Sequence, residues 1–257
     1  MPDEAVRLER RGPAAVITVD RPEARNALSS AMRREMVAMC EELRGERDIR
    51  VVLLRGAGGR SFISGGDLRE FSATPTVEGF LELERATEAL YHAVETLPMP
   101  TVAVIEGFAI GGGLMLAGTC DLRLCTPDAR LGVPIARTVG NCLSPGEYRR
   151  LTALIGPARV KELILYAQLL DAETARAWGL VSEIVEREAL EARVGELVEQ
   201  LGGQAPLTMW ATKEAVLRLR DGRATDTDIM EKVLGSHDFR EGVDAFLNKR
   251  DPRWRNE

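Results

Sequence analysis

The segments Phe62-Ile63-Ser64-Gly65-Gly66-Asp67 and Gly107-Phe108-Ala109-Ile110-Gly111-Gly112-Gly113 decide the fold of this chain. Each follows a short apolar run, at residues 51–54 and 102–105, and each leads into a helical pattern. A backbone N–H at such a turn can bind an anionic oxygen, because glycine has no side chain to block it and the dipole of the next helix favours negative charge. Two such turns together predict an oxyanion hole.

Two other interpretations of these glycines were weighed. A single strand–glycine–helix turn commonly serves tight packing alone, but two of them, each after an apolar strand, favour a functional site. Gly56-Ala57-Gly58 also follows a strand, yet the third glycine of a dinucleotide fingerprint would fall at Ser61, where no helical pattern begins. No glycine-rich stretch ends in Gly-Lys-Ser or Gly-Lys-Thr. We therefore expect no nucleotide loop of these two kinds.

Composition limits the classes of protein that remain. A chain of 257 residues with 45% hydrophobic residues forms one large domain, or one domain with an appendage. The net charge of −6 argues against nucleic-acid binding. No apolar run approaches the roughly 20 residues of a membrane span, and Met1-Pro2-Asp3-Glu4 lacks the features of a signal peptide. The 4 cysteines show no metal spacing and there are 2 histidines, so we expect a cytosolic protein without a metal site.

Strands and helices alternate in the first part of the chain. Strands are expected at residues 6–9, 14–20, 51–55, 102–106 and 121–125, and helices at about 29–43, 77–97 and 112–118. This order predicts a right-handed βαβ stack with a largely parallel sheet, whose site lies beyond the carboxyl ends of the strands.

The pattern becomes helical after Pro145. Helices are expected at 147–155, 157–166, 172–178, 188–201, 206–219, 225–234 and 238–247, with one extended piece at 181–185. Such a helical region either forms an oligomerisation surface or covers the sheet, and the pattern alone leaves both alternatives open.

Several further short segments accompany the glycine turns in a fixed order. They are Arg21-Pro22-Glu23-Ala24-Arg25-Asn26-Ala27-Leu28, Gly56-Ala57-Gly58 with Ser61-Phe62, Glu106-Gly107, Cys120-Asp121-Leu122, Ala177-Trp178-Gly179-Leu180-Val181, Thr212-Lys213-Glu214-Ala215 and Glu241-Gly242-Val243-Asp244-Ala245-Phe246-Leu247. Together with the turns, these segments resemble the enoyl-CoA hydratase/isomerase family, also called the crotonase superfamily. The resemblance covers nearly the whole chain.

The resemblance implies an α/β fold with a ββα-spiral core. It places an acyl-CoA-binding core in residues 1–200 and a helical trimerisation region in residues 201–257, and trimers in this family often pair into hexamers. The ligand it implies is a coenzyme A thioester, with no other cofactor and no metal. The activity it implies is that of a lyase or isomerase.

The resemblance also implies roles for individual residues. The backbone N–H groups of Gly66 and Gly112 match the oxyanion hole. Positions that match contacts to the substrate or to coenzyme A are Ala24, at the adenine-binding backbone, with Ser64, Asp67, Leu68, Arg69, Met115, Ile135 and Lys249. Arg69 and Lys249 match cations near coenzyme A phosphates, Lys249 towards a neighbouring subunit's ligand; the alternative is that they are solvated surface charges. Asp67 is expected to hold the first turn in place.

Both glutamates that serve the hydratases are replaced in this chain. One would stand at Met115, and the other at Ile135 in the segment Gly132-Val133-Pro134-Ile135. Neither side chain can transfer a proton. The chain thus resembles the enoyl-CoA hydratases but lacks the two glutamates with which they add water.

Other side chains are candidates for the proton transfer. Arg137, Asn141 and Cys142 lie where other members of the superfamily place alternative catalytic groups, and Glu70 and Glu88 are weaker candidates. Cys142 could be a nucleophile or acid, or a buried structural cysteine.

Three hypotheses follow for the function. The first is an acyl-CoA enzyme with an enolate intermediate and a proton donor other than glutamate, acting as lyase, isomerase, decarboxylase or thioesterase. The second is a catalytically silent acyl-CoA-binding paralogue. The third is a structural or RNA-associated relative, which the net charge of −6 disfavours.

Overall fold

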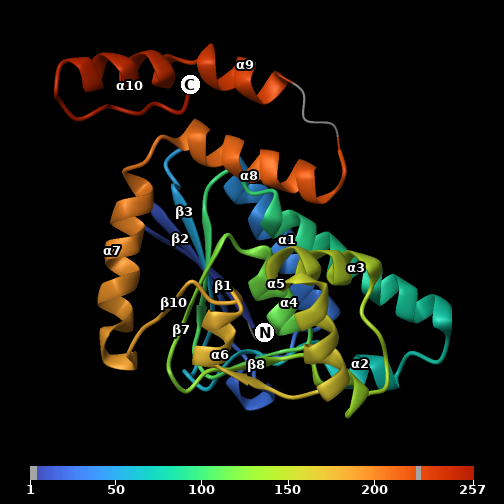
Figure 1. The fold of residues 1–257 in the computed structure, drawn as a ribbon. Coiled ribbons are helices and arrows are strands. Elements are labelled where there is room, and N and C mark those ends of the chain that lie inside the picture. The colour runs from blue at the N-terminus through green and yellow to red at the C-terminus, as the bar shows by residue number, and fades with distance from the viewer. Residues whose placement is uncertain (1–4, 224–226) are drawn as a thin grey trace.

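The computed structural model describes residues 5–223 and 227–257. The N-terminal segment 1–4 and the expected start of a helix at Thr225 lie outside the described residues. A six-stranded sheet forms the centre of the molecule, in the order β1-β2-β3-β5-β7-β10 (Figure 1). Its strands are β1 Val6–Arg11, β2 Ala14–Val19, β3 Val51–Gly56, β5 Thr101–Ile105, β7 Leu122–Cys125 and β10 Glu183–Ile184.

The first sheet confirms the expected parallel arrangement, except at one edge. The neighbours from β2 to β10 are parallel, whereas β1 and β2 form an antiparallel hairpin in which Val6 pairs with Val19 and Arg11 with Ala14. Most Val, Ile and Leu side chains of these strands are buried because helices cover both faces of the sheet.

A second, smaller sheet is the main departure from the pattern analysis. Its strands are β4 Ser61–Ile63, β6 Phe108–Ile110, β8 Arg130–Gly132 and β9 Leu170–Asp171, in that order. Three times the chain leaves a strand of the first sheet and adds a short strand to the second. The outcome is the ββα spiral that the family resemblance implied, in place of one continuous sheet.

The corners between the two sheets need glycine. Gly107 joins β5 to β6 with a φ of +65°, and a Cβ atom there would lie 2.1 Å from the carbonyl oxygen of Arg60. Any other residue would clash with the neighbouring corner. Glycine therefore fixes how closely successive turns of the spiral stack.

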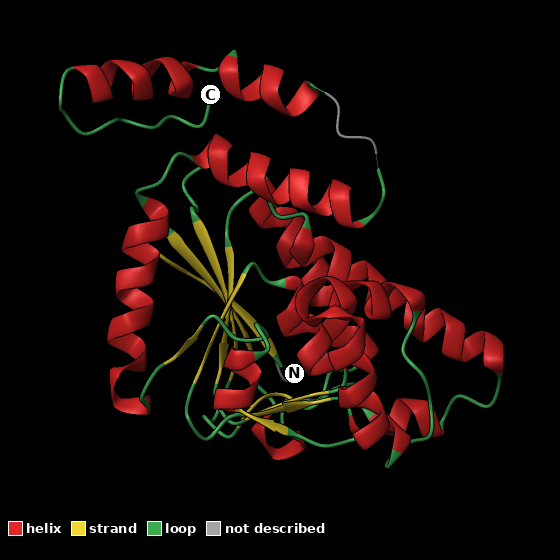
Figure 2. Ribbon diagram, viewed as in Figure 1, coloured by secondary structure: helices red, strands yellow, loops and turns green. Residues whose placement is uncertain are grey.

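Ten α-helices surround the sheets in the described ranges (Figure 2). They are α1 Ser30–Arg44, α2 Leu68–Ser72, α3 Val77–Glu95, α4 Gly112–Thr119, α5 Pro145–Tyr166, α6 Ala172–Ala177, α7 Leu190–Gly202, α8 Pro206–Arg220, α9 Asp228–Leu234 and α10 His237–Leu247. The two helices expected at 147–155 and 157–166 form α5, which is interrupted at Gly156 by a φ of +78°.

Two apolar cores stabilise the central sheet. The larger one lies between the sheet and helices α1, α3, α4 and α5, and it includes Met36, Leu54, Leu90 and Leu114. The smaller one lies on the opposite face, beneath α7. Figure 1 shows α7 alone on that face.

The C-terminal helices extend beyond this body. Helix α8 crosses the end of the central sheet, and α9 and α10 lie on its far side (Figures 1 and 2). The division of the chain into an acyl-CoA-binding core, residues 1–200, and a helical oligomerisation region, residues 201–257, stays a prediction. Two contacts tie α8 to the core: Lys213 Nζ donates to the carbonyl oxygen of Met99 at 2.9 Å, and it pairs with Asp121.

Candidate functional site

The two glycine turns lie side by side where the spiral passes from strand to helix. The first follows β4, with Gly65 at a φ of +100°, and the second follows β6, with Gly111 at a φ of +55°. A Cβ atom at Gly65 would lie 3.6 Å from the nitrogen of Gly112, and one at Gly112 would lie 3.9 Å from the nitrogen of Gly66. Backbone nitrogens 46 positions apart in the sequence are therefore neighbours in space.

Both nitrogens are available as donors. Within the described residues, no acceptor pairs with the N–H of Gly66 or of Gly112, although the adjoining Gly111 and Asp67 donate to Gly132 and Leu28. Gly112 is the first residue of α4, where an N–H has no partner within its own helix and the helix dipole adds positive potential. The pair can receive one anionic oxygen.

Close backbone contact fixes the separation of the two turns. A Cβ atom at Gly113 would lie 1.9 Å from the carbonyl oxygen of Ile63. Only glycine allows α4 to begin this close to β4.

Polar contacts anchor the first turn. Asn26 is fully buried, accepts from the N–H of Arg21 at 2.9 Å and donates to the carbonyls of Ala57 and Ser61 at 3.0 and 2.7 Å. Asp67 accepts from Arg21 Nη1 at 2.8 Å and from the N–H of Arg69 at 3.0 Å, so it caps α2. The Arg21 guanidinium lowers the pKa of Asp67. These contacts link Asp67 to Arg21 and to the start of α2; its role in holding the turn stays a prediction.

The two residues that the resemblance matches to the hydratase glutamates are apolar and buried. Met115, on α4, is 0% exposed, and Ile135, in a short 3₁₀ helix at Pro134–Ala136, is 9% exposed. Both belong to the larger core.

The loop that carries the alternative candidates is open to solvent. Arg137, Asn141 and Cys142 are all exposed. The interpretation of Cys142 as a buried structural cysteine is wrong, because its thiol lies on the surface, whereas Cys40, Cys120 and Cys125 are buried. Burial raises the pKa of each of those three thiols to about 12.

The weaker acidic candidates have structural partners. Glu70 accepts from the N–H and the hydroxyl of Ser30, both at 2.8 Å, at the start of α1. Glu88 pairs with Arg150 at 2.6 Å. Both carboxylates thus connect helices.

The positions that match coenzyme A contacts surround the first turn, with one exception. Ala24 and Ser64 are half-buried, while Leu68 and Arg69 are exposed on α2. Lys249 is also exposed, but it follows α10, which Figure 1 shows on the other side of α8 from these turns. Lys249 therefore does not lie near Ala24, Ser64, Leu68 or Arg69 of the same chain.

The pattern analysis missed a group of polar residues behind the two donors. Arg33 on α1, Glu84 and Tyr91 on α3, and Glu147 on α5 converge there. Tyr91 Oη lies 3.2 Å from the carbonyl oxygen of Gly112 and 3.3 Å from Glu147 Oε1. Arg33 Nη2 would lie 2.8 Å from a Cβ atom at Gly66. Arg33 and Tyr91 thus adjoin the two glycine positions, and Glu147 and Glu84 lie close enough to Tyr91 for their charges to act on it.

Burial changes the acidity of two of these groups. Desolvation raises the pKa of Glu147, and the carboxyl of Glu84 adds to that effect. Desolvation also raises the pKa of Tyr91 well above its usual value, followed by the charge of Glu147. Tyr91 is therefore a neutral hydroxyl at physiological pH, and Glu147 holds its proton more tightly than an exposed glutamate does.

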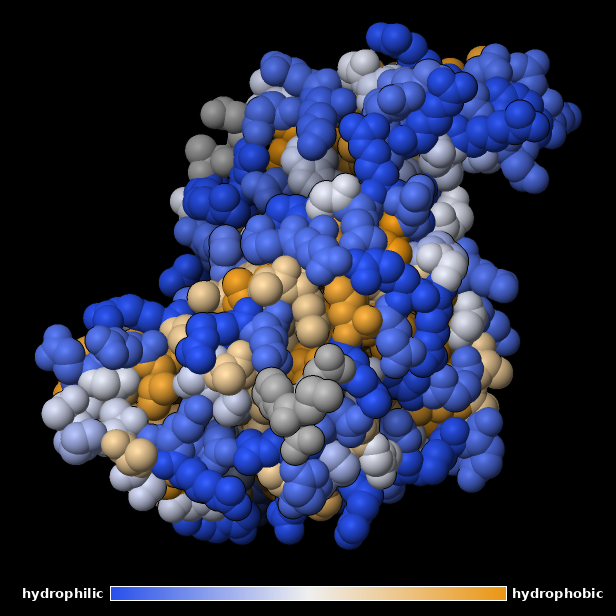
Figure 3. All heavy atoms as spheres, turned by 180° about the vertical axis from the view of Figure 1, so that it is seen from behind, coloured by the Kyte–Doolittle hydropathy of each residue, from blue (hydrophilic) through white to orange (hydrophobic). Residues whose placement is uncertain are grey.

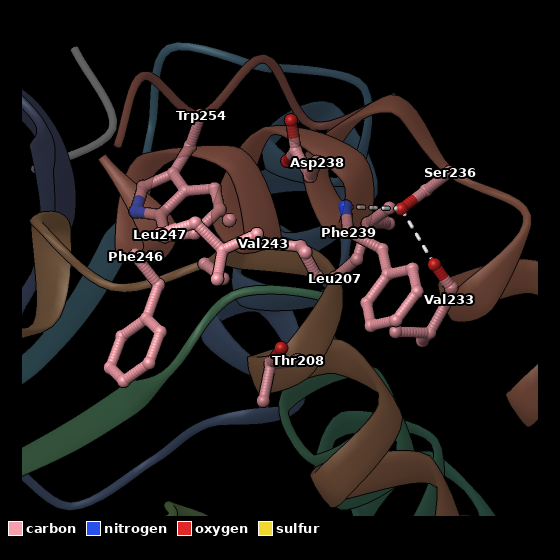
Figure 4. A pocket seen from close by; sticks show the side chains of 12 residues that line it. Leu207, Thr208, Val233, Ser236, Asp238, Phe239, Val243, Phe246, Leu247 and Trp254 are labelled. Atoms are coloured by element: carbon pink, nitrogen blue, oxygen red, sulfur yellow. Dashed lines mark hydrogen bonds between the residues drawn. The ribbon is translucent and has the colours of Figure 1, made fainter. Parts of the chain in front are cut away.

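An apolar pocket of about 320 Å³ lies elsewhere, between α8 and α10 (Figure 4). Leu207, Phe239, Val243 and Trp254 line it. Its one carboxylate, Asp238, already accepts from the backbone N–H groups of Arg255 and Asn256. The pocket therefore offers apolar contact and no free ionised group.

The described residues contain neither a metal-binding cluster nor a membrane-spanning helix. No cluster of His, Cys, Asp or Glu there could hold a metal ion. None of the helices in that part of the chain is both long and apolar enough to cross a bilayer. The cytosolic location stays a prediction.

Comparisons with known proteins agree with this geometry. The family model described as Enoyl-CoA hydratase/isomerase matches residues 9–257. The short-chain-enoyl-CoA hydratase of Clostridium acetobutylicum is 32% identical over 95% of this chain and 94% of its own length. The carnitinyl-CoA dehydratase of Citrobacter koseri is 32% identical, with 98% of each chain covered.

Solved structures match as well. An enoyl-CoA hydratase/carnithine racemase from Magnetospirillum magneticum has a TM-score of 0.92 at 32% identity, over 98% of this chain and 96% of its own. The enoyl-CoA hydratase of Bacillus anthracis has a TM-score of 0.87 at 30% identity, over 98% and 100%. The chain belongs to the enoyl-CoA hydratase/isomerase family and has the crotonase fold.

Proposed function

We propose that this protein is an enzyme that binds an acyl-CoA thioester and converts it through an enolate. The observation that carries the proposal is the pair of free N–H groups at Gly66 and Gly112. Removal of a proton from the α-carbon of a thioester moves charge onto the carbonyl oxygen, and two fixed donors stabilise that charge without reorganisation. One such donor contributes about 3–4 kcal/mol in a dry site.

Hydration of a conjugated double bond is a poor match for this site. It requires one group to activate water and another to protonate the α-carbon, and Met115 and Ile135 stand where the family's glutamates would do so. Reactions that need the enolate and a single proton-transfer group fit better. Isomerisation is the first of these, and decarboxylation is the second.

The contacts to coenzyme A follow the family's positions. We assign the adenine to the backbone around Ala24 and the phosphates to Arg69, whose guanidinium is exposed on α2 beside the first turn. Coenzyme A enters as part of the substrate, and no separate cofactor or metal is required.

The C-terminal helices are proposed to bind further copies of the chain. Large apolar side chains are exposed along them, among them Leu219, Met230, Phe246 and Leu247, at 61–84%. Figure 3, which views the molecule from behind, shows apolar residues gathered in the middle of a face that is otherwise mostly polar. A trimer or a pair of trimers would cover the apolar helix faces.

A silent acyl-CoA-binding protein is the second candidate, favoured by the loss of both glutamates. A panel of butanoyl-CoA, 3-hexenoyl-CoA, crotonyl-CoA and malonyl-CoA separates the two. An enzyme exchanges, isomerises, hydrates, decarboxylates or releases free thiol from at least one of them. A silent paralogue binds them and changes none.

Gly112 offers a matched pair of variants for testing the hole. Proline is well tolerated at the first position of a helix and removes the N–H, whereas Gly112→Ala adds the same Cβ and keeps the N–H. We expect Gly112→Pro to lose at least about 100-fold in turnover and Gly112→Ala to lose far less, with both variants folded by circular dichroism. Equal turnover in the two variants would show that this N–H plays no part.

A further inference from the structure

Tyr91 and Glu147 form a hydrogen-bonded pair directly behind the oxyanion donors. Their side chains come from α3 and α5, 56 positions apart, and meet at 3.3 Å. Tyr91 Oη would also lie 3.3 Å from a Cβ atom at Gly112. Tyr91 is 1% exposed and Glu147 is 5% exposed, so water does not compete for the pair.

Glu147 is held in one orientation. Its second oxygen, Oε2, accepts from the N–H of Ser144 at 2.9 Å, as the reciprocal half of a capping box at the start of α5. That contact leaves Oε1 directed at the Tyr91 hydroxyl. A helix cap thus presents a carboxylate oxygen to the centre of the site.

One buried polar atom near Tyr91 has no hydrogen-bond partner in the described part of the chain. Glu84 Oε1 makes no hydrogen bond among the described residues, whereas Arg33 Nη1, which also makes no hydrogen bond, lies 3.5 Å from Glu70 Oε2 in an ion pair. Arg33 is 5% exposed, and its other terminal nitrogen adjoins the position of Gly66. Buried polar atoms are nearly always paired, so the unpaired Glu84 Oε1, on the helix that carries Tyr91, is an acceptor open to a ligand.

We propose that Tyr91 and Glu147 are the proton relay of this enzyme. The inference rests on the proposed function, since it needs a thioester carbonyl at Gly66 and Gly112. The C–H bond at the α-carbon breaks and its electron pair moves into the carbonyl to give the enolate. Tyr91 Oη takes that proton while its own proton passes to Glu147 Oε1.

The reverse transfer completes the reaction. Once the protons on Tyr91 and Glu147 have been replaced by solvent deuterons, the reverse transfer through Tyr91 delivers a deuteron to the α-carbon, which is exchange; transfer to the γ-carbon of an unsaturated chain instead shifts the double bond. The proton leaves one carbon and arrives at another, so no water, oxidant or reductant is consumed. The substrate class is an enoyl-CoA whose double bond moves between the α,β and β,γ positions.

The relay requires an ionised Glu147, so its rate depends on pH. Glu84 and Glu88 on α3 oppose ionisation, and the backbone N–H of Ser144 and the Tyr91 hydroxyl favour it. Arg150 on α5 lies 5.4 Å from the centroid of the Tyr91 ring, and Arg33 on α1 also faces Tyr91. We expect the rate to rise with pH to a plateau, because the carboxylate is the active form.

The experiment measures exchange of the α-protons of butanoyl-CoA in D₂O by NMR. Glu147→Gln keeps an oxygen for the cap and removes the base, and Tyr91→Phe removes the relay hydroxyl. We expect both variants to bind butanoyl-CoA with unchanged Kd and to lose about 10²–10⁴-fold in exchange rate. Glu162→Gln, an exposed change on the same helix, should leave the rate and its pH profile unchanged.

The outcomes separate the relay from the proposed function. Wild-type exchange that survives in both variants overturns the relay and leaves the proposed enolate enzyme standing. Binding without exchange in the wild type overturns the relay and favours the silent acyl-CoA-binding protein over the enzyme. Failure of the wild type to bind butanoyl-CoA overturns both. A pH-dependent wild-type rate that becomes flat in Glu147→Gln supports the relay, because loss of a cap alone does not remove a titration.

Discussion

Gly113 sets how closely the two glycine turns, with their proposed oxyanion donors, approach each other. A Cβ atom there would meet the carbonyl oxygen of Ile63 at 1.9 Å, and a backbone atom cannot rotate away. We expect Gly113→Ala to lower the free energy of unfolding by about 3 kcal/mol or more, as overpacking does. Gly195→Ala on α7 is the control, since nothing lies within 4 Å of its Cβ position. Urea unfolding that gave the same midpoint for both variants would refute this account of the turns.

Met115 and Ile135 are the positions at which the proposed function predicts a defect in hydration. We expect the wild-type protein to hydrate crotonyl-CoA several orders of magnitude more slowly than an ordinary enzyme turning over at about 10 s⁻¹. Met115→Glu with Ile135→Glu should raise that rate, provided that the buried carboxylates ionise. The disappearance of crotonyl-CoA absorbance measures it. Wild-type turnover near 10 s⁻¹ would contradict our reading of both positions.

The sequence pattern points to the two glycine turns but not to the side chains behind them. Gly66 and Gly112 stand in glycine turns that follow apolar strands, and this pattern is visible along the chain. Glu147 belongs to Ser144-Pro145-Gly146-Glu147, which is typical of a helix start. Because capping already accounts for a glutamate here, the sequence gives no sign that its other carboxylate oxygen contacts Tyr91. In the sequence, Tyr91 is one residue of a long helical pattern, and nothing there distinguishes it from a core residue. Only the packing of α3 against α5 brings the two together.

Among the elements, α3, α5 and α8 are joined by a buried ion network. Arg150 donates to Glu95 at 2.8 and 2.9 Å and to Glu88, and Arg220 also pairs with Glu95. The side chains of Arg150 and Glu95 are each 4% exposed. The network therefore places α8 against the helices that carry Tyr91 and Glu147.

Replacement of Arg150 tests how much this ion network stabilises the protein. We expect Arg150→Met to destabilise the protein by about 3 kcal/mol, because the buried carboxylate of Glu95 and the half-exposed one of Glu88 lose a cation while Arg220 still compensates in part. Thermal unfolding measures it. Arg10→Met, which breaks an exposed pair with Glu46, is the control and should shift the midpoint much less. A larger shift in the control would contradict the assignment.

Element prediction succeeded where periodicity had room to show. The strands β2, β3 and β5 and the helices α3, α7 and α8 lie close to their expected ranges, because each is long enough for its apolar spacing to be read. The strands β4, β6 and β8 have three residues each, too few for any alternation. The second sheet therefore followed only from the family resemblance.

At the scale of the whole molecule, the apolar faces of α8, α9 and α10 predict self-association. Light scattering at micromolar concentration should give three or six times the chain mass of 28.2 kDa. Phe246→Asp with Val243→Asp should lower that mass, since both side chains are exposed on α10. Leu165→Asp, on an equally exposed site of α5, should not. A wild-type mass of 28.2 kDa would refute the assembly.

The carbonyl stretch of a bound thioester tests the central claim most directly. Butanoyl-CoA labelled with ¹³C at the carbonyl, observed by difference infrared spectroscopy, reports hydrogen bonding at that oxygen alone. We predict a lower frequency on the wild-type protein and on Gly112→Ala than in water, because two N–H groups polarise the bond. Gly112→Pro should reverse most of the shift. A bound thioester whose carbonyl frequency is the same in water, wild type and Gly112→Pro would contradict an oxyanion hole at Gly66 and Gly112.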